Sequence, residues 1–428
     1  MQSRSELLRS TWLWLLLGLL TREAFSFWTG HPYDFELWVR LGYAMLHGGD
    51  PYGSLPPAPG LSFANPYNIR DTPTIAYLPF WPLVTGLMYI LYSNLSVTDN
   101  LAYYFLLKQP IILGDLALAY LLYSYVKARK ARSAGWVLRF WVFSPFTIIL
   151  SGVWGMFDSI AMAFIVLSMM ASRWLKRSAW AGLGTFAKSI PVIYAIPLSI
   201  NKSRTWQSLL VSITLPVTLS ISIFVAMGWS FPAITSALTY TVTRWGESMS
   251  LWDGLFYFEF LGIMPTPTQI ASTIAGAVWI PALIIVTVVA CRKFRLDTDY
   301  GLVQALILVT LGFLLFKARI TEQYALYLLA LSALDVAIWN PRRRPILLAT
   351  MVTVIIYLVT NNYFLIRFLL PTFPIALQLE GSLAVTIGPG RLAANFMTAS
   401  AFTFLNIWYL VEVLRGKEPS SSIQHSIE

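Results

Sequence analysis

The amino-acid sequence predicts an all-α, polytopic integral membrane protein. Of its 428 residues 57% are hydrophobic and only 12% are charged, too few charges to cover a soluble globule of this size. The mean hydropathy of +0.64 agrees with this class. Long apolar runs alternate with short Lys and Arg clusters, the pattern that orients membrane helices. We expect about ten full transmembrane helices in a single domain, residues 1–428.

Charge and cysteine content exclude several other classes. The net charge of +10 is spread over clusters between apolar runs, not along one face, which argues against a nucleic-acid partner. The single cysteine, Cys291, excludes an internal disulfide, and three histidines argue against a His-ligated metal. We expect no metal and no cofactor.

The N-terminal segment predicts an anchor followed by a long outer loop. Arg4 and Arg9 precede the first apolar run, which places the N-terminus in the cytosol and residues 29–100 outside. Apolar residues at helical spacing from Phe35 to Leu46 predict a helix that can lie on the membrane, with Asp34 where its N-cap would be. A second interfacial helix is expected at 75–92, because Pro79 and Pro82 interrupt that run.

The remaining apolar runs follow in order and end in a polar tail. Ala179 to Ile200 is broken at Lys188-Ser189 and has cations at both ends, which predicts a re-entrant pair of half-helices. The tail, 415–428, is expected to be disordered and cytosolic. The other expected spans are 101–126, 136–152, 159–172, 208–227, 269–290, 300–316, 325–339, 347–365 and 392–414, and 228–267 and 367–391 are expected outer loops.

Ionisable residues from separate loops are predicted to meet at the outer face. Charges beside apolar spans are functional candidates, since their burial is costly. A carboxylate can take a proton from an acceptor hydroxyl, and cations can hold a departing phosphate. The residues in question are Asp34, Glu36, Arg70, Asp158, Lys317, Arg319 and Glu322.

Several motifs, in order, resemble one enzyme family. Asp34 and Glu36 lie before Gly48-Gly49-Asp50-Pro51-Tyr52, and Thr72-Pro73 leads to Tyr77. Further matches are Lys108 with Asp115, Ser144-Pro145-Phe146, Gly155 to Ser159, Lys188-Ser189-Ile190-Pro191 with Tyr194 and Pro197, and Lys317 to Tyr324. Together they resemble the GT-C glycosyltransferases that use polyprenol-phosphate sugars, most closely the GPI mannosyltransferase 1 family and the phosphatidylinositol-mannoside mannosyltransferases.

The resemblance implies a GT-C fold and an inverting transfer of a hexose, most often mannose. The donor would be a dolichyl or polyprenyl monophosphate sugar, and the acceptor a lipid-linked molecule on the outer or lumenal face. The membrane would be that of the endoplasmic reticulum or the plasma membrane of an archaeon or bacterium. We also consider an accessory membrane subunit as a partner.

The same resemblance assigns roles to the candidate residues. Asp34 would be the catalytic base, with Glu36 as a second carboxylate. The donor phosphate would be bound by Lys317, Arg319, Gln323, Tyr324 and Lys188, and the substrates by Arg70, Tyr77, Asp158 and Glu322. Glu36 stands where the family has Asp, which leaves acceptor and linkage open.

Two other classes stay open. A flippase for a polyprenyl-linked glycan would need ionisable groups near the membrane midplane, such as Lys188. A non-catalytic membrane scaffold would make the outer charges incidental.

Overall fold

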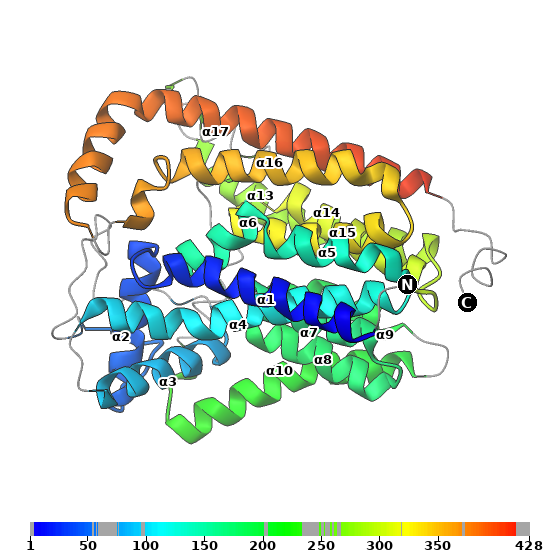
Figure 1. The fold of residues 1–428 in the computed structure, drawn as a ribbon, viewed down its shortest axis with the longest axis horizontal. Coiled ribbons are helices and arrows are strands. Elements are labelled where there is room, and N and C mark those ends of the chain that lie inside the picture. The colour runs from blue at the N-terminus through cyan, green and yellow to red at the C-terminus, as the bar shows by residue number, and fades with distance from the viewer. Residues whose placement is uncertain are drawn as a thin grey trace.

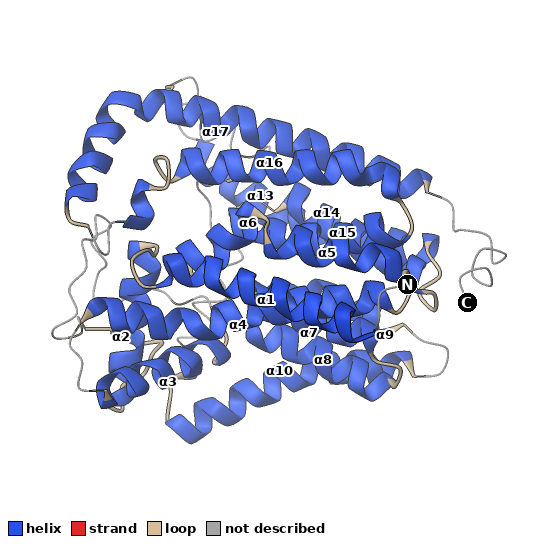
Figure 2. Cartoon of the chain, viewed as in Figure 1, coloured by secondary structure: helices blue, strands red, loops and turns tan. Residues whose placement is uncertain are grey.

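A computed structural model describes residues 4–53, 55–56, 58, 75, 77–95, 99–200, 204–232, 248–249, 252, 257–258, 261–262, 267–317, 319–369 and 373–416. Within these ranges the regular structure is helical and contains no strand, which confirms the all-α class (Figure 2). The start of α1 (Arg4–Ser26) and the end of α17 (Ile375–Arg415) lie at one end of the molecule. The short helices α2 (Pro32–Leu46) and α3 (Phe80–Asn94) lie at the opposite end (Figure 1).

The other helices largely follow the predicted apolar runs. α14 (Asp299–Phe316) and α15 (Ala325–Ile338) form the centre, and every residue of α14 from Tyr300 to Leu314 is buried. The bounds are α4 (Asn100–Lys127), α5 (Ala131–Val142), α6 (Pro145–Ile148), the π-helix η1 (Ile149–Trp154), α7 (Asp158–Met170), α8 (Trp174–Ala187), η2 (Ile190–Tyr194), α9 (Ala195–Ser199), α10 (Thr205–Met227), α13 (Pro267–Lys293), α14 (Asp299–Phe316), η3 (Glu322–Tyr324), α15 (Ala325–Ile338), η4 (Pro341–Arg343), α16 (Arg344–Asn361) and η5 (Ile366–Leu369).

Fewer helices than expected have the length of a full span. Among the described residues, six helices are long and apolar enough to cross a membrane, or seven if α5 and the α6–η1 segment, bent by 47°, count as one. The sequence-based expectation was about ten. The difference comes from apolar segments such as α7 (13 residues) and α15 (14 residues), which are shorter than the 20 or so residues of a full span. The chain is a polytopic integral membrane protein.

Two expected irregular segments had different outcomes. The break at Lys188 is confirmed, because α8 ends at Ala187 and η2 begins at Ile190. The segment 367–391, expected on the outer side, is helical over most of its length, since α17 begins at Ile375 and continues past Arg391. Pro389 lies inside α17, and a proline is tolerated there where the helix bends, as its orange part does in Figure 1.

The α2 helix departs from its predicted setting. It begins at Pro32 with His31 as N-cap, so Asp34 lies in the first turn and is not the cap. The predicted membrane-facing side is largely buried in protein. Trp38 packs against Trp81 of α3 with ring centroids 5.1 Å apart, and Phe35 packs edge-on against Tyr104 of α4 at 4.7 Å. Aromatic partners in the neighbouring helices cover the apolar face that periodicity alone would assign to lipid.

A fully buried ion pair joins the helices that carry this end of the molecule. Arg22 of α1 lies 2.6 Å from Asp115 of α4, and both side chains are fully buried. Asp115 also accepts hydrogen bonds from Trp141 at 3.0 Å and Ser159 at 2.9 Å. The guanidinium further donates to Ser151, to Thr147 and to the Val142 carbonyl. Nearly every polar atom of the pair is thus satisfied, as burial of charge requires.

Neutralising Asp115 is expected to destabilise the protein strongly. Asp115→Asn keeps the side-chain shape but leaves Arg22 buried without its counter-charge, at a cost of about 3–5 kcal/mol. The control is Asp297→Asn, which removes an exposed pair with Arg295 at 3.4 Å and is expected to change stability by less than about 0.5 kcal/mol. Thermal unfolding in detergent measures both, and equal midpoints for the two variants would contradict the structural role of the pair.

Candidate functional site

The site is built around a turn that begins in a π-helix. η1 spans Ile149–Trp154 and ends at Gly155, whose φ of 89° is a left-handed conformation that favours glycine. π-helical segments often occur at functional sites, because the wider turn shifts the direction of the side chains that follow. Here the turn directs the Trp154 side chain toward the start of α2.

Asp34 lies at the meeting point of that turn and α2. The Trp154 indole donates a hydrogen bond to Asp34 Oδ2 at 2.9 Å. His31 Nδ1 lies 3.2 Å from the same oxygen, and the Asp34 side chain is 13% exposed. Burial, together with the positive charge of Arg367, lowers the pKa of His31 well below its ordinary value. The imidazole is therefore neutral at neutral pH, so the Asp34 carboxyl group lies beside a neutral ring.

The segment after α16 closes this site from the other side. Phe368 contacts the rings of both Trp154 (5.6 Å) and His31 (6.0 Å), and its carbonyl accepts a hydrogen bond from Gly30 at 2.8 Å. Three consecutive non-glycine residues, Tyr363 to Leu365, have φ between 46° and 68°. Such strained conformations persist only where surrounding contacts enforce them. Two of the contacts made by the Tyr363 ring are with the guanidinium groups of Arg367 and Arg391.

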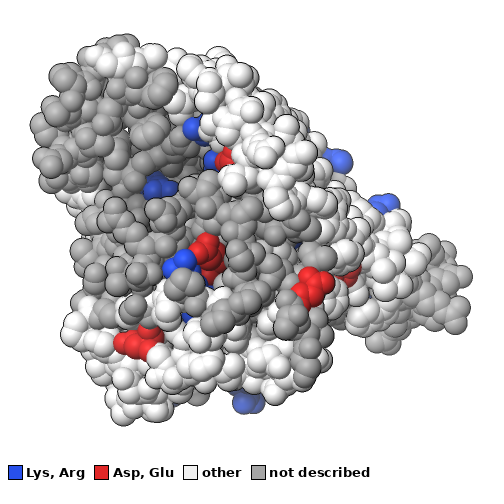
Figure 3. Space-filling model, turned by 90° about the vertical axis from the view of Figure 1, so that its left-hand side faces the viewer, with Lys and Arg blue, Asp and Glu red and all other residues white. Residues whose placement is uncertain are grey.

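Arg367 and Arg391 both lie against the Tyr363 ring, with guanidinium carbons 5.1 Å and 5.0 Å from its centroid. Arg367 is also paired with Glu380 at 2.8 Å. Looking onto the α2 end of the molecule, Figure 3 shows basic and acidic side chains next to one another in the middle of that face. Charges of both signs are thus gathered on this face.

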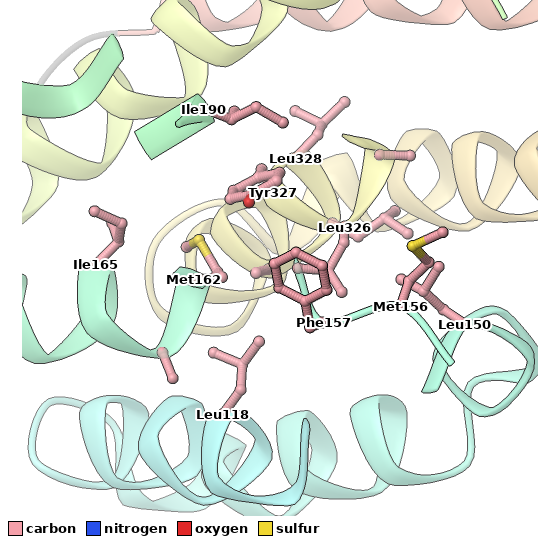
Figure 4. Packing of buried hydrophobic residues seen from close by; sticks show 14 of the residues in the cluster. Leu118, Leu150, Met156, Phe157, Met162, Ile165, Ile190, Leu326, Tyr327 and Leu328 are labelled. Carbon is pink, nitrogen blue, oxygen red and sulfur yellow. The ribbon is translucent and has the colours of Figure 1, made fainter. Parts of the chain in front are cut away.

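Lys188 is paired with Asp158. Its ammonium lies 2.5 Å from Asp158 Oδ2, with side-chain exposures of 6% and 0%. The same ammonium lies 4.8 Å from the Phe157 ring centroid and 5.7 Å from that of Tyr324. Figure 4 shows Phe157 packed among Leu118, Met162 and Leu326, so the pair borders the apolar core. Of the two roles the sequence left open for Lys188, the structure provides the buried carboxylate partner.

The Lys317 to Tyr324 turn lies beside this pair. The Tyr324 ring lies against the Lys188 ammonium, and the Glu322 carboxylate accepts a hydrogen bond from the Asn361 side-chain amide at 2.9 Å. Lys317 is buried, with its ammonium 4.9 Å from the Trp279 ring centroid, Gln323 is buried and Arg319 is partly buried. Asn361 also accepts from Arg391 at 3.0 Å, which connects this turn to the arginines around Tyr363.

Three predicted site residues remain to be placed: Glu36, Tyr77 and Arg70. Glu36 is paired with Arg40 one turn along α2, and two residues after Asp34 it points away from that carboxylate. Tyr77 accepts a hydrogen bond from Tyr52 through its carbonyl at 2.8 Å, and its ring packs against Phe157. Arg70 lies outside the described residues.

Sequence reasoning missed four residues of this site: His31, Trp154, Arg367 and Phe368. Arg367 carried a usable signal, since it is a cation in a segment expected on the outer side, against the orientation bias. Trp154 and Phe368 carried no such signal, because aromatic residues are common at membrane interfaces.

Within the described residues, no group of three or more His, Cys, Asp or Glu side chains is placed to hold a metal ion. A cavity of about 310 Å³ lies at the opposite end of the molecule, between Thr11, Trp12, Tyr120 and Lys127. It includes none of the predicted site residues.

These features describe a helical membrane protein with a clustered polar site at one end. No family model matches the chain. The chain is similar to the GPI mannosyltransferase 1 of Eremothecium gossypii, with 26% identity over 202 residues, which make up 44% of this chain and 49% of that protein. The matched part thus spans about half the length of the relative. The similarity is distant and covers less than half of this chain.

The depressed pKa of His31 predicts a stability that falls in mild acid. The unfolded chain binds a proton at this histidine near pH 6.5 while the folded chain does not, so folding loses up to about 1.4 kcal/mol per pH unit below that value. His31→Asn removes this contribution. Melting temperatures of both proteins between pH 7.5 and 5.5 measure it, and we expect the wild type to lose more. An identical decline in the two proteins would show that His31 is protonated in the fold.

The Lys188–Asp158 pair predicts a specific double-mutant result. Lys188→Met leaves Asp158 buried and unpaired and is expected to cost about 3–5 kcal/mol, while adding Asp158→Asn restores most of the loss. Thermal unfolding of the two singles and the double measures this coupling. Additive losses would contradict a direct pair.

Proposed function

We propose that this protein is an inverting membrane mannosyltransferase that uses a dolichyl or polyprenyl monophosphate sugar and a lipid-linked acceptor. The observation that carries the proposal is the setting of Asp34, a largely buried carboxylate beside a neutral imidazole and an indole donor. The distant similarity to a GPI mannosyltransferase supports the sugar and the type of reaction.

In the proposed reaction Asp34 takes the proton of an acceptor hydroxyl as the oxygen attacks the anomeric carbon of the donor. The new bond from carbon to acceptor oxygen forms while the bond from carbon to phosphate oxygen breaks. The electron pair leaves with the polyprenyl phosphate, and the anomeric configuration inverts. A single base and a monophosphate leaving group suffice, so the mechanism uses no metal.

The leaving phosphate needs positive charge close to it. We assign this role to the turn of Lys317 and Arg319, with Gln323 and Tyr324. Lys188 belongs to the same group of contacts through Tyr324, although Asp158 neutralises its charge. Arg70, Tyr77, Asp158 and Glu322 remain proposed substrate-binding residues, and Glu36 has a secondary role because it is paired with Arg40.

The direct test is transfer of radiolabelled mannose from dolichyl-phosphate-mannose to a membrane lipid extract by the purified protein. Asp34→Asn removes the base at constant shape and is expected to lower kcat by about 10²–10⁴-fold. The control, Asp297→Asn, changes an exposed carboxylate and should leave transfer intact. Glu36→Gln is expected to lower kcat by at most about tenfold.

The outcomes separate the proposal from its rivals. Equal transfer by Asp34→Asn and wild type would remove Asp34 from the mechanism. The buried Lys188–Asp158 pair at a broken helix is the observation that favours a flippase instead. No transfer with any polyprenyl donor, together with loss of glycolipid translocation in Lys188→Ala but not in Asp34→Asn, would establish that alternative.

A further inference from the structure

Lys108 of α4 is a buried cation held by neutral oxygens. Its side chain is fully buried, and its ammonium lies within hydrogen-bond distance of four oxygens. The Thr29 carbonyl lies at 2.6 Å, the Gly152 carbonyl at 2.7 Å, and the Thr29 hydroxyl and the Val153 carbonyl at 3.0 Å. An ammonium has three N–H donors, so this arrangement uses its full capacity.

These four oxygens come from two segments far apart in the sequence. Thr29 lies in the link between α1 and α2, two residues before His31 and five before Asp34. Gly152 and Val153 lie in η1 immediately before Trp154. Each segment therefore carries one partner of the hydrogen bond from the Trp154 indole to the Asp34 carboxylate.

The geometry of η1 explains why a cation is needed at this position. The carbonyls at the C-terminal end of a helix have no partner in the helix and carry partial negative charge. Gly155 turns the chain away in a left-handed conformation, which leaves the Gly152 and Val153 carbonyls directed at Lys108. An apolar residue at position 108 would leave these buried carbonyls without this donor. The loss of a hydrogen bond to a buried acceptor lowers the stability of the fold.

We propose that Lys108 is a positioning residue for Asp34. Its ammonium bridges the α1–α2 link and the π-helix, and so holds Trp154 at hydrogen-bond distance from the carboxylate. This inference rests on the proposed role of Asp34 as the base. A displacement of about 1 Å in a catalytic group costs on the order of 10²-fold in rate, so such a bridge affects catalysis without contacting the substrate.

The experiment is a double-mutant cycle between Lys108→Met and Trp154→Phe, with kcat, donor KM and the pH–rate profile as readouts. Each single change is expected to lower kcat by at least about tenfold with little change in KM. Each should also move the acidic limb of the profile to higher pH, because the carboxylate loses a hydrogen-bond donor. The double variant should be no slower than the worse single by more than about twofold. Independent, multiplicative effects would overturn the proposal.

The matched control is Lys130→Met, which removes another lysine bonded to a carbonyl, that of Ile338 at 3.1 Å, and should leave kcat unchanged. If Lys108→Met does not fold, Lys108→Gln, which keeps two N–H donors, takes its place in the cycle. A loss of thermal stability with kcat and pH profile unchanged would show a structural role alone, and would also overturn the proposal.

A second readout separates this inference from the proposed function. Hydrogen–deuterium exchange of peptides covering residues 29–34 and 150–156 needs no substrate. Lys108→Met is expected to raise exchange in both peptides, and Lys130→Met in neither. If Lys108→Met raises exchange but Asp34→Asn does not affect transfer, the bridge by Lys108 is supported and Asp34 is not the catalytic base. Unchanged exchange would overturn the bridge itself.

Discussion

The ion pair between Arg22 and Asp115 is the interaction on which the described architecture depends. Both side chains are fully buried, and their hydrogen bonds reach α1, α4, α5, α6, η1 and α7. A buried pair contributes little net stability compared with well-packed apolar residues. Its directional bonds do, however, require one relative placement of these helices. An apolar contact would allow them to slide along one another, since membrane helices lack a strong hydrophobic drive to pack in one register.

The segment from Ser151 to Ser159 connects the ion pair to the candidate site. Ser151 and Ser159 bond to Asp115, Gly152 and Val153 to Lys108, and Trp154 to Asp34. Phe157 then packs between the aromatic residues of α2 and α3, and Asp158 holds Lys188. Nine consecutive residues thus link two buried lysines and a carboxylate to the same ion pair. A substitution at Asp115 is therefore expected to alter the position of Asp34, through packing and hydrogen bonds alone.

A second buried polar centre fixes the opposite end of the molecule. Arg343 binds Asp335 at 2.9 Å, and Gln304, Asn340 and Tyr409 complete the hydrogen bonds around that carboxylate. This centre joins α14, α15 and α17, whereas the first joins the N-terminal helices. The polar site around Asp34 and Tyr363 receives residues from both halves. Its geometry therefore depends on how the two groups of helices pack together, and the strained backbone from Tyr363 to Leu365 closely precedes Phe368, which contacts His31 and Trp154.

The sequence by itself determined the helical membrane class, the approximate helix positions and the break at Lys188, and it marked Asp34 as a candidate base. Hydropathy, prolines and charge clusters are local signals, so no knowledge of neighbours is needed to interpret them. Tertiary structure alone decided that α2 is covered by protein and that α17 begins at Ile375, well before the expected span. It also decided that Trp154 bonds to Asp34 and that Arg367 and Phe368 lie near His31, because these residues come from distant segments that only packing brings together.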